Sequence, residues 1–281
     1  MELTLTLPPV SLVESYAFCR DIAKSRARNF YYSFVLLSHE QKNAMCAMYA
    51  FMRFCDDLSD EEGANLREIQ RWQTELDDAL AGHFSGHPVW PAFYDAVRRY
   101  QIPHRYFHEM IAGVSSDLQP RKIETFDQLS RYCYQVAGVV GLTTIHIFGF
   151  DSPDALPLAE KCGLAFQLTN ILRDVREDAD HGRVYIPAED LGRFGADLQR
   201  HNANFVRLMR FEAQRAHDYY QQSQPLIDLI HKRSRPSLWA LIQIYRRLLD
   251  RIEHSNFDVL ERRISLPAWE KLSIVARAAV M

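Results

Sequence analysis

Apolar residues recur at steps of three and four along most of the chain, and this spacing limits its fold more than any other feature. In segment 39–60, Met45, Met48, Met52 and Cys55 form one such stripe, as expected for a helix with one face in a core. No segment alternates apolar and polar residues for long enough to predict a β-strand. The pattern therefore predicts an all-α protein in which helices pack on helices.

Glycine and proline residues divide this pattern into segments. Pro103 separates two predicted helices, and His181-Gly182 ends a long one. We find no internal repeat and no linker in the 281 residues, so residues 1–281 are expected to form a single domain. The predicted helices span 39–60, 66–80, 104–118, 126–150, 154–180, 197–222 and 236–256, with another beginning near 87–88.

Charge and cysteine content exclude several classes of protein. The 33 basic and 36 acidic side chains are mixed without a long basic run, so nucleic acid is not an expected partner. The five cysteines are odd in number and lie in apolar helical stretches, which predicts buried, reduced thiols and a cytoplasmic location. The N-terminal residues do not resemble a secretory signal. The most apolar run, 136–150, is shorter than the roughly 20 residues of a membrane span.

One predicted helix carries a polar stripe on an otherwise apolar segment. Tyr49, Arg53, Asp56 and Asp60 are spaced four, three and four residues apart. Eleven residues at about 100° each return to within roughly 20° of the starting direction, so these four side chains share one face. A single D-x-x-x-D pair is common, and its ordinary explanation is a solvated helix face.

A second segment repeats the arrangement with Gln167, Asn170, Asp174 and Asp178 on one face. Like charges at i,i+4 destabilise a helix by a few tenths of a kcal/mol, and anions near a helix C-terminus are also unfavourable. Two such pairs, each preceded by amide or guanidinium groups, therefore indicate that a cation offsets the cost.

The ligand types identify the cation. Carboxylate and amide oxygens without nearby Cys or His suit Mg²⁺ rather than Zn²⁺, and Mg²⁺ commonly bridges carboxylates to phosphate. Arginine can cover the remaining phosphate charge with its bidentate fork. The candidates are Arg28, Arg53, Arg173 and Arg183, for which an ordinary ion-pair role is the alternative.

Several motifs together resemble the squalene/phytoene synthase family. They are N-F-Y-Y-S-F at 29–34, Y-A-F-M-R-F-C-D-D-L-S-D at 49–60, Y-C-Y-Q-V-A-G-V-V-G at 132–141, Q-L-T-N-I-L-R-D-V-R-E-D at 167–178 and G-R-V-Y-I-P at 182–187. The resemblance covers nearly the whole chain and implies an isoprenoid-synthase helical bundle with a central apolar cavity. It also implies head-to-head joining of two prenyl diphosphates with two or three Mg²⁺ ions.

The resemblance assigns roles to individual residues. It implies metal ligation by Asp56, Asp60, Asn170, Asp174 and Asp178. Gly138 would leave a groove for a prenyl chain, although close helix–helix packing is the alternative for it and for Gly141. Asn29 departs from the small hydroxyl residue common in the family. The other implied residues are catalytic Tyr49, Arg53, Tyr134 (beside the reacting carbons), Arg173 and Tyr185, and substrate-binding Arg28, Phe30, Gly138, Gln167, Tyr245 and Arg262.

The wording of the motifs resembles bacterial presqualene diphosphate synthases of hopanoid pathways more than phytoene synthases. The expected reaction is therefore condensation of two farnesyl diphosphates to presqualene diphosphate, and condensation of two geranylgeranyl diphosphates to phytoene is the alternative. No G-x-G-x-x-G motif argues for NADPH. The apolar product is compatible with transient contact at the inner membrane and with transfer to downstream pathway enzymes.

Two readings of a different kind remain. Some proteins of this fold are non-catalytic assembly factors that have lost aspartates, and the two intact aspartate pairs argue against that reading. His104 and His108 stand at i,i+4 beside Glu109, which is a fragment of a zinc site without an evident third ligand.

Overall fold

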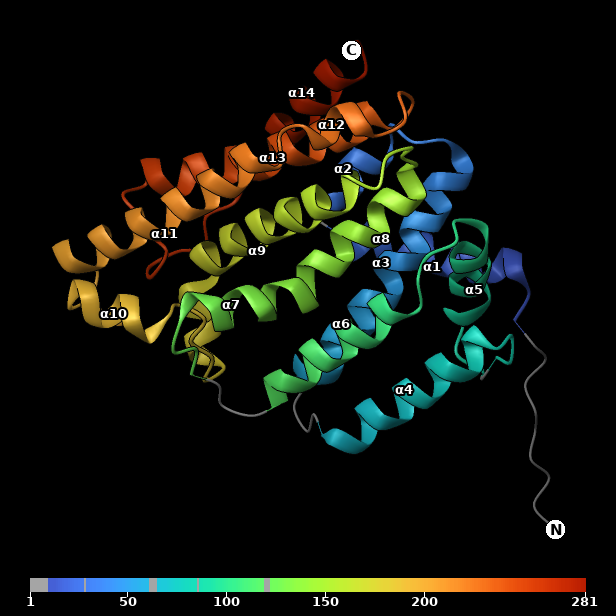
Figure 1. The fold of residues 1–281 in the computed structure, drawn as a ribbon, viewed down its shortest axis with the longest axis horizontal. Helices are drawn as coiled ribbons and strands as arrows, with labels where there is room; N and C mark the ends of the chain where they lie inside the picture. Colours follow the sequence, from blue (N-terminus) through green and yellow to red (C-terminus); the bar gives the residue numbers. More distant parts are fainter. Residues whose placement is uncertain (1–9, 28, 61–64, 85, 119–121) are drawn as a thin grey trace.

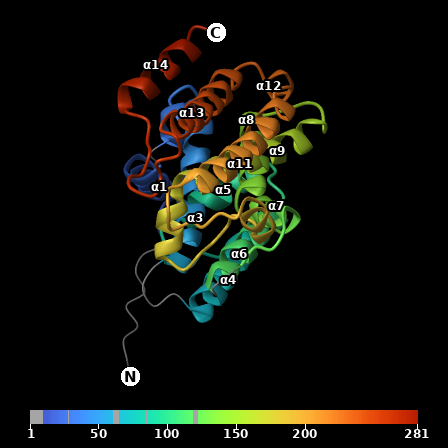
Figure 2. The same ribbon diagram turned by 90° about the vertical axis from the view of Figure 1, so that its left-hand side faces the viewer.

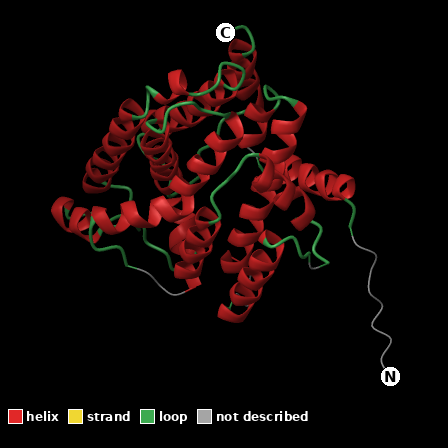
Figure 3. Ribbon diagram, turned by 45° about the vertical axis from the view of Figure 1, so that its right-hand side comes forward, coloured by secondary structure: helices red, strands yellow, loops and turns green. Residues whose placement is uncertain are grey.

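The computed structural model describes residues 10–27, 29–60, 65–84, 86–118 and 122–281, without the side chains of residues 59 and 60. These residues form helices and loops, and their only β-contacts are two isolated bridges. The all-α prediction is therefore confirmed (Figure 3). The first helices are α1 (Leu12–Arg26), α2 (Phe30–Phe34), α3 (His39–Asp60), α4 (Leu66–Leu80), α5 (Trp90–Arg99), α6 (Arg105–Ser115) and α7 (Phe126–Cys133). The others are α8 (Val139–Phe148), α9 (Ala155–Asp180), α10 (Ala188–Phe194), α11 (Ala203–Gln222), α12 (Leu226–Leu229), α13 (Arg235–His254) and α14 (Ala268–Ala278).

The two helices with polar stripes, α3 and α9, lie at the centre of the bundle (Figures 1 and 2). Helices α1, α5, α6 and α8 pack on α3, and α7, α8, α11 and α13 pack on α9. Buried apolar side chains from most helices form one continuous core around them. The central position of these helices explains why their sequences are apolar on the faces opposite the polar stripes.

Polar caps set where several helices begin. The side chains of Asn65 and Thr125 accept backbone N–H groups at the starts of α4 and α7. Asn202 caps α11 in the same way by accepting from the N–H of Phe205. The sequence-based start of this helix at 197 was wrong because the capping asparagine, rather than the amphipathic pattern, fixes the first turn.

The predicted helix 126–150 is interrupted by a π-helical turn. Residues Tyr134–Gly138 form this turn between α7 and α8, and such turns insert one extra residue into a helix. Periodicity did not reveal it because α8 is apolar on all sides. The turn packs against α6, α8 and α9 and displaces the following residues relative to a regular helix.

Glycines allow α8 and the π turn to approach α9 closely. A methyl group built on Gly163 would lie 2.4 Å from the carbonyl oxygen of Ala137, and one on Gly141 would lie 2.6 Å from that of Ala159. Both distances are far below van der Waals contact, so only glycine fits. Gly141 therefore serves close helix packing, which was the alternative to a prenyl-chain groove at this position.

Two further features agree with the sequence. All five cysteines are buried and free of disulfide bonds. None of the helices among the described residues has both the length and the apolar character that a membrane crossing requires.

We predict that Gly163→Ala lowers the free energy of unfolding by about 2 kcal/mol, because the added methyl group forces α9 away from the π turn. Urea denaturation followed by circular dichroism measures the effect. Gly192→Ala is the control, since a methyl group there meets no atom within 4 Å and should be neutral or stabilise by up to about 1 kcal/mol. Equal effects of the two substitutions would show that the close approach is not needed.

Candidate active site

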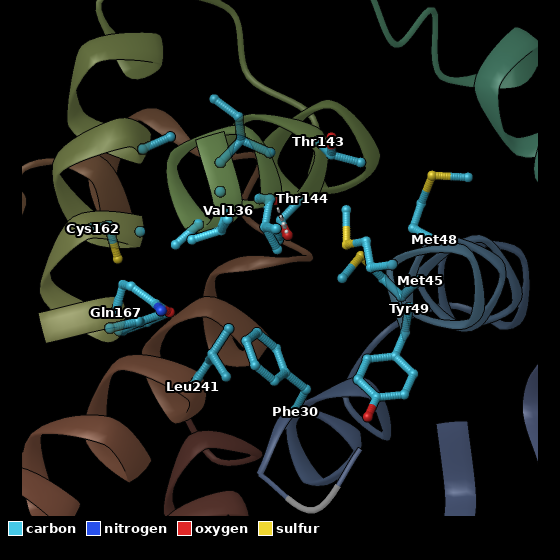
Figure 4. A pocket seen from close by; sticks show the side chains of 18 of the residues that line it. Phe30, Met45, Met48, Tyr49, Val136, Thr143, Thr144, Cys162, Gln167 and Leu241 are labelled. Carbon is cyan, nitrogen blue, oxygen red and sulfur yellow. Dashed lines mark hydrogen bonds between the residues drawn. The ribbon is translucent and has the colours of Figure 1, made fainter. Parts of the chain in front are cut away.

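A large apolar cavity lies inside the bundle. Its empty volume, which includes open solvent at its mouth, is about 1040 Å³. Side chains from α2, α3, α6, α8, α9, α12 and α13 line it. Figure 4 shows the side chains of Phe30, Met45, Met48, Val136, Cys162 and Leu241 around this space.

Polar residues of the lining gather toward one end of the cavity. Tyr49 and Asp56 reach it from α3, and Gln167 and Asn170 reach it from α9. Met45 and Asp56 both line the cavity and are eleven residues apart in α3. Eleven residues span about 16 Å along a helix. The cavity therefore has a polar mouth and a long apolar interior, and the two predicted polar stripes meet at that mouth.

On the α3 side of the mouth, two arginines share one carboxylate. Arg53 forms a short ion pair with Asp57, and Arg26 donates to the same carboxylate at 2.7 Å. The Nε of Arg53 is buried and has no hydrogen-bond acceptor among the described residues. Burial raises the pKa of Tyr49 to about 12, so its hydroxyl stays protonated. This side of the mouth thus offers an unused N–H donor.

On the α9 side, the helix is kinked at the first predicted carboxylate ligand. Asp174 has φ −104° and ψ 15° inside the helix. Arg173 holds it with two hydrogen bonds, one of 2.7 Å from Nε. Arg263 also contacts Asp174, with 3.0 Å between Nε and Oδ1, and lies 3.3 Å from Glu177. The kink and these arginines fix the direction of the Asp174 carboxylate.

Asp178 lies one turn further along α9 in a buried setting. Burial and, to a smaller extent, the nearby Asp174 carboxylate together raise its pKa to about 8 against the opposing effect of Arg183. A carboxyl group in this position is unfavourable as an anion unless positive charge lies beside it. The raised pKa of Asp178 agrees with the unfavourable i,i+4 carboxylate pair that the sequence pattern indicated.

The residues of the mouth fit a hard cation together with an anion. The Oδ1 of Asn170 is buried and accepts no hydrogen bond from the described residues. Its amide nitrogen faces Gln167, 3.4 Å from Oε1. An unused amide oxygen near carboxylates is a suitable ligand for Mg²⁺, and the unused Arg53 N–H across the mouth suits a phosphate oxygen.

Three aromatic rings pack together beside this mouth, and two of them, Phe30 and Phe166, line the cavity. Tyr245 of α13 is buried, stacks on Phe166 at 4.3 Å between centroids and meets Phe30 edge-to-face at 5.6 Å. Its hydroxyl hydrogen-bonds with Asn170 and Asn29. Phe30 and Tyr245 were both predicted from the sequence to contact substrate, and the structure brings them together beside Asn170.

Tyr185 belongs to a buried pair of tyrosines. Its ring stacks on that of Tyr132 at 4.9 Å, and the two hydroxyl oxygens are 3.1 Å apart. Tyr132 donates to Oδ2 of Asp117 at 2.7 Å, and Tyr185 donates to Oδ1 at 3.1 Å. The negative charge of Asp178 contributes to raising the pKa of Tyr185, so this pair lies near the α9 carboxylates. The sequence did not identify Tyr132 or Asp117, although Tyr132 stands in the same Y-C-Y motif as Tyr134.

Several predicted residues are not part of the cavity lining, and Tyr134 and Gly138 are among them. Tyr134 faces two outer hollows, near Glu160 and near Gln135, instead of the space where the reacting carbons were expected. Gly138 lies in the contact with α9, where its Cα is 3.1 Å from a methyl group built on Gly163. The π turn accounts for both positions because it begins at Tyr134 and ends at Gly138.

Arg262 was predicted to bind substrate, but its neighbour Arg263 is the arginine that contacts Asp174. Arg262 pairs with Asp258 at 3.2 Å and is largely exposed, whereas its neighbour Arg263 contacts Asp174. Both line an outer hollow with Arg173 and Asp174. The R-R dipeptide gave no sequence signal for choosing between them. Arg28 and the side chain of Asp60 lie outside the described residues.

The zinc-site alternative gains no third ligand. His108 lies 3.5 Å from Asp77. In the described part of the chain, neither His104 nor His108 joins a group of three His, Cys, Asp or Glu side chains close enough to hold a metal.

Comparison with known proteins decides the family. A family model described as squalene/phytoene synthase matches residues 23–270. The chain belongs to the squalene/phytoene synthase family. The chain is 36% identical to a phytoene synthase of Arthrospira platensis over 285 residues, covering 94% of this chain and 92% of the relative. A phytoene synthase of Mycobacterium tuberculosis is 37% identical over 279 residues, with 94% and 90% covered.

Solved structures agree with this assignment. A dehydrosqualene synthase in complex with ligand superposes with a TM-score of 0.89 at 30% identity, covering 96% of both chains. A squalene synthase of Alicyclobacillus acidocaldarius gives a TM-score of 0.81 at 25% identity, covering 89% of this chain and 97% of that one. The isoprenoid-synthase helical bundle is therefore confirmed, and the chain is a member of a family of prenyltransferase-type enzymes.

We predict that Arg263→Gln raises the KM for a prenyl diphosphate roughly tenfold, because Asp174 loses a charged partner that orients it. Arg262→Gln is the matched control and should change KM by less than about twofold, since its partner is Asp258. Steady-state release of pyrophosphate measures both. A larger effect at Arg262 would contradict the placement.

Proposed function

We propose that this enzyme condenses two identical allylic prenyl diphosphates head to head with release of diphosphate. The observation that carries the proposal is the polar mouth above the apolar cavity. There Asn170, whose oxygen accepts no hydrogen bond from the described residues, lines the cavity with Asp56 and Gln167. The Nε of Arg53, on the same helix as Asp56, has no acceptor among the described residues. Such a mouth suits a metal-bound diphosphate, and the interior suits hydrocarbon chains.

The metal would be Mg²⁺, as two or three ions held by Asp56, Asp60, Asn170, Asp174 and Asp178. When bound, Mg²⁺ neutralises diphosphate and so lowers the barrier to breaking the allylic C–O bond. Facing ligands from α3 and α9 are consistent with ions that bridge the two helices through substrate phosphate.

The arginines would hold the diphosphates. Arg53 offers its buried Nε from α3, and Arg173 is fixed beside Asp174 on α9. Tyr49 stands at the mouth with a protonated hydroxyl. Gln167 lies on the opposite side, next to Asn170. These groups bind and orient the leaving diphosphate through charge-assisted hydrogen bonds.

Tyr185 would contact diphosphate from beside Asp178. Its hydroxyl is fixed by Asp117 and Tyr132, so it is held in one direction. Burial raises its pKa above the ordinary value, which keeps the hydroxyl protonated as a hydrogen-bond donor. Tyr132 and Asp117 would then act as positioning residues for Tyr185.

The apolar interior would protect the allylic cation. Water that reached the cation would trap it, and an apolar lining excludes water. The faces of Phe30, Phe166 and Tyr245 form the aromatic group nearest to Asn170, and aromatic faces stabilise cations. The double bond of the second prenyl chain would attack this cation, and a proton would pass to the released diphosphate as the cyclopropane ring closes.

The proposed substrate is farnesyl diphosphate, and the proposed product is presqualene diphosphate of a hopanoid pathway. The motif wording and the likeness to a dehydrosqualene synthase and a squalene synthase support this choice. Geranylgeranyl diphosphate is the second candidate, favoured by curated relatives that are named phytoene synthase at 33–37% identity. Enzymes that consume this product would act downstream.

We predict that Asp56→Asn and Asp174→Asn each lower turnover at least about a hundredfold while the helical content stays unchanged, because each removes a metal-ligating carboxylate. EDTA should abolish activity and Mg²⁺ should restore it. Asp218→Asn is the control, since Asp218 is exposed on α11 and, among the described residues, accepts a hydrogen bond from Gln214 alone. Full activity of both site variants would refute the proposed metal site.

We predict that mass spectrometry of products, with farnesyl and geranylgeranyl diphosphates offered together, detects presqualene diphosphate as the main product. Phytoene as the main product would establish the second candidate instead. Absence of pyrophosphate release from either substrate would show that the protein is a non-catalytic relative.

A further inference from the structure

Helix α14 turns its charged residues inward. Glu270 and Lys271 are both buried. Glu270 lies 3.3 Å from Arg247 and 3.5 Å from Arg251 of α13. The ammonium group of Lys271 lies over the ring of Tyr32 in α2, at 5.2 Å from its centroid. Both charges of this part of the helix are thus used to attach α14 to the protein.

The outward face of α14 is apolar instead. The side chains of Trp269 and Leu272 are 68% and 56% exposed. Ser273 and Ala276 continue the same exposed stripe at helical spacing, and the exposed Arg277 lies at the edge of this stripe, against the ring of Trp239. Solvent-exposed helix faces are ordinarily polar, so this reversal marks a surface that is covered when the protein is in its working state.

Positive charge lies at the same end of the molecule. Lys232 and Arg233 are exposed in the turn between α12 and α13. Figures 1 and 2 both show this turn and α14 at one end of the bundle. Neither side chain forms an ion pair with the described residues. The whole chain has a formal charge of −3, so this is a local basic region.

Helices α2 and α13, on which α14 packs, also line the cavity. Phe34 and Leu238 line the cavity, and their neighbours in sequence, Val35 and Trp239, lie on the outer side. Val35 is 51% exposed, and the guanidinium of Arg277 in α14 lies 5.9 Å from the ring of Trp239. Helices α2 and α13 therefore separate the cavity from α14 by a single layer.

We propose that the outward face of α14, with Val35 and the basic turn of Lys232 and Arg233, docks on an anionic lipid surface. An exposed Trp with an uncharged apolar stripe suits insertion at the boundary between headgroups and acyl chains. The flanking cations suit anionic headgroups. A symmetric dimer through this face would bring these cations close to those of the second copy, which is unfavourable.

The probe is vesicle co-sedimentation of the full chain without substrate. Vesicles of phosphatidylcholine are compared with vesicles in which part of the lipid is phosphatidylglycerol. We expect binding to the anionic vesicles that falls as salt rises. Trp269 is the most exposed of the four tryptophans, so binding should also shift the fluorescence emission to shorter wavelength.

Three variants separate the contributions. Trp269→Ser with Leu272→Ser should weaken partition onto anionic vesicles about tenfold or more. Lys232→Gln with Arg233→Gln should weaken it about tenfold on anionic vesicles and leave neutral ones unchanged. Val13→Ser is the control: Val13 is 77% exposed on α1, and its loss should have no effect. All substituted side chains are exposed, and thermal unfolding checks that each variant folds.

Each outcome has a defined meaning. No vesicle binding by the unsubstituted protein, or equal binding by all variants, overturns the proposal. A concentration-dependent dimer in light scattering that the Trp269/Leu272 variant abolishes, without vesicle binding, assigns the face to a second copy and also overturns it. Because no substrate is present, these results are independent of the proposed reaction.

Discussion

Carboxylates gathered at the edge of an apolar cavity repel one another, and the arrangement of the site depends on how that repulsion is balanced. Arg26 and Arg53 share Asp57 on the α3 side, and Arg173 and Arg263 hold Asp174 on the α9 side. The balance is incomplete, since burial and Asp174 still raise the pKa of Asp178. Burying carboxylates beside one another costs free energy unless positive charge lies next to them.

The scaffold holds the two sides of the mouth at a fixed separation through backbone features rather than through large side chains. Gly141 and Gly163 let α8 and the π turn approach α9 to a distance at which a methyl group would clash. The kink at Asp174 then redirects the end of α9. Irregular turns within helices occur frequently at functional sites. Here the π turn precedes α8, and the kink at Asp174 interrupts α9.

The same bundle separates two kinds of surface. Charged side chains cluster at the mouth of the cavity, whereas α14 buries Glu270 and Lys271 and exposes Trp269 and Leu272. The apolar interior lies between these regions, behind α2 and α13. One layer of helices, α2 and α13, lies between the apolar interior and α14.

The sequence by itself determined the all-α fold, the central helices and the mouth residues Tyr49, Asp56, Gln167 and Asn170, because helical periodicity places residues eleven apart on one face. It could not choose between Tyr132 and Tyr134 or between Arg262 and Arg263. Those choices depend on the π turn and on the loop after α13, which bring residues distant in sequence to Asp117 and Asp174. Periodicity describes a single helix, whereas the direction of a side chain across a cavity depends on how helices pack, and only the tertiary structure decides that.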